Sequence, residues 1–75
     1  MKSRYLSNSE IRQMAHAALS NYEFSCEWRK AFAAADEYAR DELLVSPTRA
    51  QSATATNMAK VMWESMVIDV QGRIQ

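Results

Sequence analysis

Residues 24–43 of the chain read FSCEWRKAFAAADEYARDEL, and this stretch decides the fold class. At about 100° per residue its apolar side chains share one arc of about 140°, and most of its charged side chains lie outside that arc. This pattern predicts an amphipathic helix over residues 21–44. We expect Trp28 and Phe32 in the core, and the alternative is that they form an exposed binding stripe. The apolar set is Phe24, Trp28, Ala31, Phe32, Ala35, Tyr38, Ala39 and Leu43.

Two helix-start signals precede this stretch. Ser7 and Glu10 have the spacing of a capping box, and Leu6 and Ile11 have the spacing of a hydrophobic staple. They predict a first helix over residues 8–19. The same spacing recurs from Ser20, which predicts that the second helix begins near residue 21. The chain then either turns sharply there or forms one long, kinked helix.

A third helix is predicted over residues 47–74. Pro47 interrupts the preceding helix but is accepted in a first turn, and Thr48 and Gln51 have capping-box spacing. Residues 51–57 are small and polar, so they form either a weak helix or a loop. The following residues are apolar over roughly half of the helix circumference, which is more than one contact buries. We expect the dimer or partner interface on this surface, at Met58, Met62, Trp63, Met66, Val67 and Val70.

Composition supports a helical architecture. The chain has 75 residues with one glycine and one proline, too few turn-formers for many short strands. Alanine is the commonest residue and favours helices. We therefore expect an all-α protein, with residues 1–75 forming a single domain. Its architecture would be a compact bundle of three helices, or four if the third is broken. A core this small is often completed by association, so a homodimer is expected.

The sequence contains no recognisable catalytic or metal-binding pattern. One cysteine, Cys26, and one histidine, His16, rule out a Cys/His zinc finger. The acidic residues of the second predicted helix lack a Glu-x-x-His or EF-hand spacing, so they are interpreted as a solvated face. We expect a non-enzymatic protein without a cofactor or metal. These acidic residues are Asp36, Glu37, Asp41 and Glu42.

Nucleic-acid binding is the alternative function. Nine basic and nine acidic residues balance to zero net charge, so long-range attraction to phosphates is weak. One segment nevertheless offers side chains that read bases, in a polar helix start after a tight turn. That arrangement suits a helix-turn-helix-like DNA-binding regulator. Its base-reading candidates are Arg49, Gln51 and Thr54.

The leading hypothesis is a protein–protein interaction module. The chain resembles small accessory proteins in general, because it combines clear helix caps and surplus apolar helix surface with no catalytic pattern. Such proteins include modulators, inhibitors and subunits encoded by bacteria, plasmids or phages. The chain would dock on a larger protein or assembly and alter its activity. No apolar run approaches the 18 residues or so of a membrane span, no signal peptide is visible, and the single cysteine suits a reducing compartment. We expect a cytoplasmic protein without membrane contact.

Overall fold

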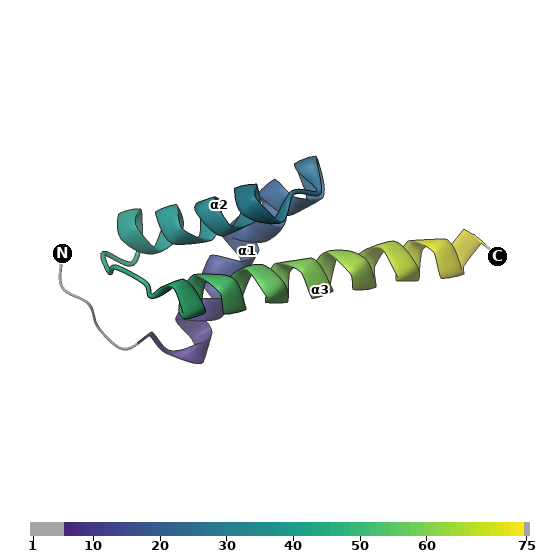
Figure 1. The fold of residues 1–75 in the computed structure, drawn as a ribbon. Helices are drawn as coiled ribbons and strands as arrows, with labels where there is room; N and C mark the ends of the chain where they lie inside the picture. The colour runs from purple at the N-terminus through teal and green to yellow at the C-terminus, as the bar shows by residue number, and fades with distance from the viewer. Residues whose placement is uncertain (1–5, 75) are drawn as a thin grey trace.

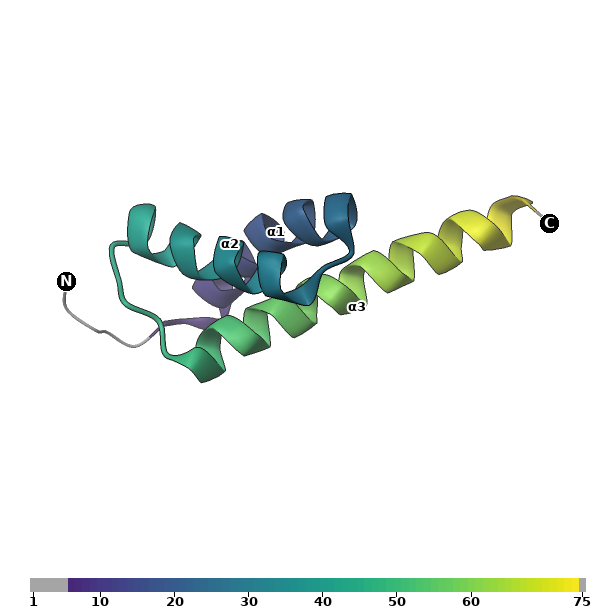
Figure 2. The same cartoon turned by 45° about the horizontal axis from the view of Figure 1, so that its top comes forward.

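The computed structural model describes the backbone of residues 6–74 and the side chains of residues 6–67. Within the described residues the chain forms three helices and no strand: α1 (Asn8–Ser25), α2 (Trp28–Asp41) and α3 (Arg49–Ile74). Every pair of helices is in contact, and α1 and α2 pack along the first half of α3 (Figures 1 and 2). The expectation of a compact, all-helical fold is confirmed.

The start of α1 follows the sequence signal. The Ser7 hydroxyl accepts a hydrogen bond from the Glu10 backbone N–H at 3.2 Å, and the Glu10 carboxylate accepts one from the Ser7 N–H at 3.0 Å. Leu6 is buried and Ile11 packs against the core, as a hydrophobic staple requires. The capping box therefore fixes where the first helix begins.

The expected helix boundary near residue 20 is wrong. Helix α1 continues through this point to Ser25, and α2 covers only Trp28–Asp41 instead of residues 21–44. The buried face of α1 at Met14 and Ala18 continues into Tyr22, which also packs against the core. Packing along the whole face therefore overrides a local cap signal, because a cap at Ser20 would need extended backbone there.

The turn between α1 and α2 lies six residues later, at Cys26. Cys26 adopts a left-handed conformation (φ 55°, ψ 28°), and its N–H donates to the Tyr22 carbonyl at 2.5 Å. The Ser25 hydroxyl accepts from the Glu27 N–H at 3.3 Å, which holds the chain as it enters α2. Left-handed residues commonly end helices, so backbone geometry at Cys26 terminates α1.

The loop between α2 and α3 is anchored inside the protein. Leu44 is left-handed (φ 56°), and the Val45 N–H donates to the Ala39 carbonyl at 3.1 Å. Val45 and Pro47 are buried.

Helix α3 begins at Arg49, two residues after the proline. The Thr48 hydroxyl accepts from the Gln51 N–H at 3.1 Å, and the Gln51 side-chain oxygen accepts from the Thr48 N–H at 2.8 Å. This second capping box confirms the expected start signal and places the helix start two residues later than residue 47.

The polar first half of α3 is helical rather than a loop. Ser52 and Thr56 are fully buried in it, and the Thr56 hydroxyl donates to the Ser52 carbonyl at 2.7 Å. The Ser52 hydroxyl donates to the Asp36 carboxylate at 3.4 Å. Packing and these hydrogen bonds offset the weak helix propensity. Helix α3 is continuous from Arg49 to Ile74, and no described helix is long and apolar enough to cross a bilayer.

The core consists mainly of small side chains. Seven alanines are fully buried, together with Met14 and Val45, and Leu6 is 3% exposed. Helices that meet through alanine approach closely, which leaves no space for rings between them. The expectation that Trp28 and Phe32 lie in the core is therefore wrong for Trp28, which is 38% exposed, whereas Phe32 is half-buried. The buried alanines are Ala15, Ala18, Ala31, Ala35, Ala39, Ala55 and Ala59.

Candidate functional site

The apolar face of α3 extends beyond the part that the other helices cover. At about 100° per residue, the buried positions of its first half and the apolar positions of its second half share one arc of about 140°. The buried positions are Ser52, Ala55, Thr56 and Ala59. We name the apolar continuation the α3 stripe; together with Met58, at its edge, it comprises Met62, Trp63, Met66 and Val67.

The residues of the α3 stripe are only partly buried. Met58 and Met62 still pack against the core, and Trp63 and Val67 are half-buried. Met66 is 43% exposed. Figures 1 and 2 both show the second half of α3 projecting past α1 and α2. Five of the six predicted interface residues thus lie on one continuous surface, while the Val70 side chain lies outside the described residues.

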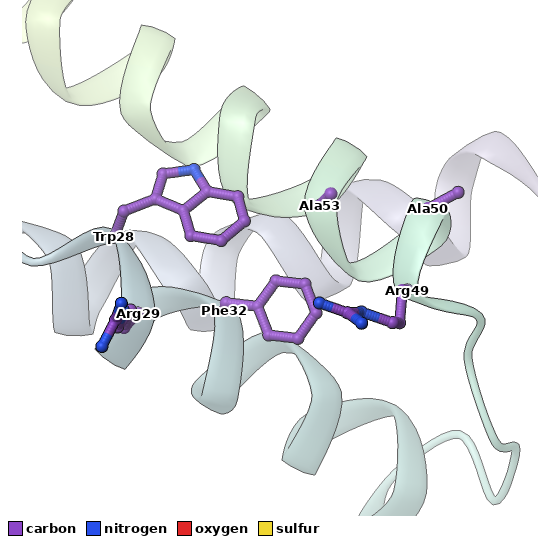
Figure 3. Close-up of a pocket in the computed structure, with 6 residues that line it drawn as sticks. All are labelled: Trp28, Arg29, Phe32, Arg49, Ala50 and Ala53. Atoms are coloured by element: carbon purple, nitrogen blue, oxygen red, sulfur yellow. The ribbon is translucent and has the colours of Figure 1, made fainter.

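A second apolar surface lies between the first turns of α2 and α3. It is a cavity of about 500 Å³, which we name the aromatic cavity. The rings of Trp28 and Phe32 pack together there, with centroids 5.2 Å apart and planes tilted by 33°. The Trp28 indole N–H donates to the Asn57 side-chain oxygen at 3.1 Å, which fixes the ring against α3. The lining residues are Trp28, Arg29, Phe32, Arg49, Ala50 and Ala53 (Figure 3).

Two arginines give the aromatic cavity its charge. In the view of Figure 3 the Phe32 ring lies between Arg29 and Arg49, the Arg49 side chain extends toward it, and the Trp28 ring lies above Arg29. Both arginines are exposed, and neither makes an ion pair within the described residues. The cavity therefore combines an apolar floor with a cationic rim.

The three residues proposed for base reading differ in their local hydrogen bonds. Arg49 is exposed at the aromatic cavity, whereas the Gln51 side chain is engaged in the capping box with Thr48. The Thr54 hydroxyl donates to the Ala50 carbonyl at 2.8 Å. Within the part of the chain that the structure describes, only Arg49 of the three side chains therefore makes no hydrogen bond.

The histidine, the cysteine and the acidic residues of the sequence analysis do not lie together at one site. His16 lies within α1 and Cys26 ends the same helix ten residues later, so they are about 15 Å apart along its axis. Asp36 pairs with Arg40 at 2.8 Å, while Glu37, Asp41 and Glu42 line an open, shallow surface beside Tyr38. Within the described residues no group of three His, Cys, Asp or Glu side chains has the geometry to hold a metal ion.

No protein-family model, curated protein or solved structure matches this chain. Sequence periodicity found the α3 stripe, but it missed that Arg29 and Arg49 meet at one cavity. No sequence signal pointed to this, because the predicted helix over residues 21–44 places Trp28 inside a helix and not at its start.

Proposed function

We propose that this chain is a non-enzymatic protein–protein interaction module that forms a homodimer through the α3 stripe and docks on a larger protein to alter its activity. The observation that carries the proposal is the apolar face of α3, which continues past the part covered by α1 and α2. We place the protein in the cytoplasm, because its single cysteine suits a reducing compartment.

The length of α3 supports pairing of two copies. Its 26 residues span about 39 Å, against about 21 Å for the 14 residues of α2. A helical segment without packing is only marginally stable in water, so its apolar face needs a partner. A second projecting α3 offers a helix of the same length with the same apolar face.

The charges near the α3 stripe also favour a second copy. The described part of the stripe carries no charged side chain, and the neighbouring Lys60 and Glu64 pair with each other at 3.8 Å. The surface therefore selects for neither an acidic nor a basic partner. An apolar surface of this kind is complementary to itself across a two-fold axis, the commonest symmetry of homodimers.

The test compares Met66→Glu with Val61→Glu by sedimentation equilibrium. Both side chains are exposed on α3, at 43% and 60%, but Val61 lies about 140° around the helix from Met66, where it lines a hollow with Met58 and Met62 at the edge of the α3 stripe. We expect the wild-type chain and Val61→Glu to sediment as dimers. Met66→Glu should sediment as a monomer that keeps its helical circular dichroism, because a charge is then placed in an apolar interface. A wild-type chain that is monomeric at every accessible concentration would overturn the dimer.

A further inference from the structure

We propose that the aromatic cavity binds an acidic peptide segment of a protein partner. One aliphatic side chain of the segment would lie on the rings of Trp28 and Phe32, and flanking carboxylates would pair with Arg29 and Arg49. This site goes beyond the proposed self-association, because none of its lining residues belongs to the α3 stripe. The inference rests on the proposed docking function: it names the aromatic cavity as the docking site and an acidic segment as the part of the partner that binds there.

The floor of the cavity suits an aliphatic anchor. Its volume of about 500 Å³ lies in the range of ligand-binding pockets. Ala50 and Ala53 keep the α3 wall low, so the two rings stay open to an incoming side chain. The hydrogen bond from Trp28 to Asn57 fixes the larger ring before anything binds. A preformed apolar floor reduces the entropy lost on binding.

The cationic rim of the aromatic cavity favours a negatively charged ligand. Lys30, Arg40 and Lys60 each pair with a carboxylate three or four residues away. Among residues 6–67, Arg12, Arg29 and Arg49 make no such pair, and two of these three lie at the aromatic cavity. Guanidinium groups bind carboxylates through paired hydrogen bonds, so two unpaired arginines beside an apolar floor select an acidic, amphipathic segment.

Charge and ring geometry favour a peptide over a nucleic acid. A nucleic-acid surface needs a basic stripe that follows several phosphates, whereas two basic residues, Arg29 and Arg49, line this cavity. The chain as a whole has no net charge. The rings of Trp28 and Phe32 pack on each other at a tilt and thus form a curved floor, not parallel plates for stacked bases.

The experiment measures fluorescence anisotropy of a labelled synthetic peptide in which one leucine is flanked on both sides by glutamates. Three comparison probes are a peptide with glutamine for glutamate, a peptide with serine for leucine, and a labelled single-stranded oligonucleotide. The proteins are the full chain, Arg29→Gln, Arg49→Gln and the matched control Arg12→Gln. Arg12 is also exposed and unpaired within the described residues, but it lies on α1 outside the cavity.

We expect the acidic leucine peptide to bind the full chain and Arg12→Gln equally. Each cavity arginine variant should bind about tenfold more weakly, because a charge-assisted hydrogen bond is lost. Both substituted peptides should bind more weakly than the parent. Trp28 emission should shift on binding in a Trp63→Phe background, which leaves Trp28 as the only tryptophan.

Three results would overturn the inference. They are no binding of the acidic peptide, equal binding by the arginine variants, and tighter, Arg49-dependent binding of the oligonucleotide, which would assign the cavity to nucleic acid. Met66→Glu separates the two proposals, because a monomer should bind the peptide as well as a dimer does. Peptide binding by a monomeric wild-type chain would overturn the dimer alone.

Discussion

Single residues decide where the helices stop in this chain. The only glycine is Gly72, so both left-handed positions of the described backbone carry side chains: Cys26 at the end of α1 and Leu44 in the loop after α2. A left-handed residue with a Cβ costs about 1–2 kcal/mol. The sequence thus places a strained residue at each of the two turns that bring the helices together.

Replacing Cys26 with glycine should stabilise the fold. Cys26 is an exposed free cysteine, so the change removes backbone strain without losing buried contacts. We expect the free energy of unfolding to rise by about 1 kcal/mol in urea denaturation, the lower end of the left-handed penalty. Ala33→Gly, at an exposed position inside α2, is the control and should lower it by about 1 kcal/mol. A lower stability of Cys26→Gly would contradict this role of the turn.

At the scale of the element, α2 is defined by its narrow inner face. Ala31, Ala35 and Ala39 repeat every four residues and are all fully buried. Residues four apart share a helix face, so the three methyl groups form a smooth contact for α1 and α3. The larger side chains Trp28 and Phe32 flank this face and line the aromatic cavity.

Enlarging the inner face of α2 should separate the helices. Ala35→Leu inserts a bulky side chain where the helices meet, and overpacking of this kind costs about 1–3 kcal/mol. Thermal unfolding followed by circular dichroism should show a lower midpoint for this variant. Ala33→Leu adds the same side chain on the exposed face of α2 and should leave the midpoint nearly unchanged. Equal midpoints for the two variants would show that the alanine face is not a close contact.

At the scale of the whole molecule, a small core supports one helix, α3, that extends beyond the part covered by α1 and α2. The fully buried side chains are mostly alanine, which remove little apolar surface from water. The α3 stripe holds larger apolar groups, and α1 and α2 cover them only in part, since Met66 is exposed and Trp63 and Val67 are half-buried. Much of the apolar surface available for stabilisation therefore remains outside the bundle of a single copy.

Stability should consequently depend on protein concentration. If two copies pair through the α3 stripe, mass action raises the midpoint of thermal unfolding as concentration increases. We expect this rise for the wild-type chain and for Val61→Glu in calorimetry across a dilution series. Met66→Glu should unfold at one midpoint throughout, because its stripe carries a charge. A concentration-independent wild-type midpoint would count against dimerisation.

The sequence alone determined what depends on local chemistry. The caps at Ser7 and Thr48 place two helix starts within about two residues, because a capping box satisfies backbone N–H groups regardless of the rest of the fold. Helical periodicity also determined the all-α class and the continuous apolar face of α3, since both follow from residue spacing.

Only the tertiary structure decided the features that depend on contacts between helices. It extended α1 through the apparent cap at Ser20, because burial of Tyr22 along the same face outweighs a local hydrogen bond. It left Trp28 at the surface, because alanine contacts bring the helices too close for a ring. It also placed Arg29 and Arg49 at one cavity, although they are far apart in sequence, because α2 packs along α3 with Trp28 beside Asn57 and Asp36 beside Ser52.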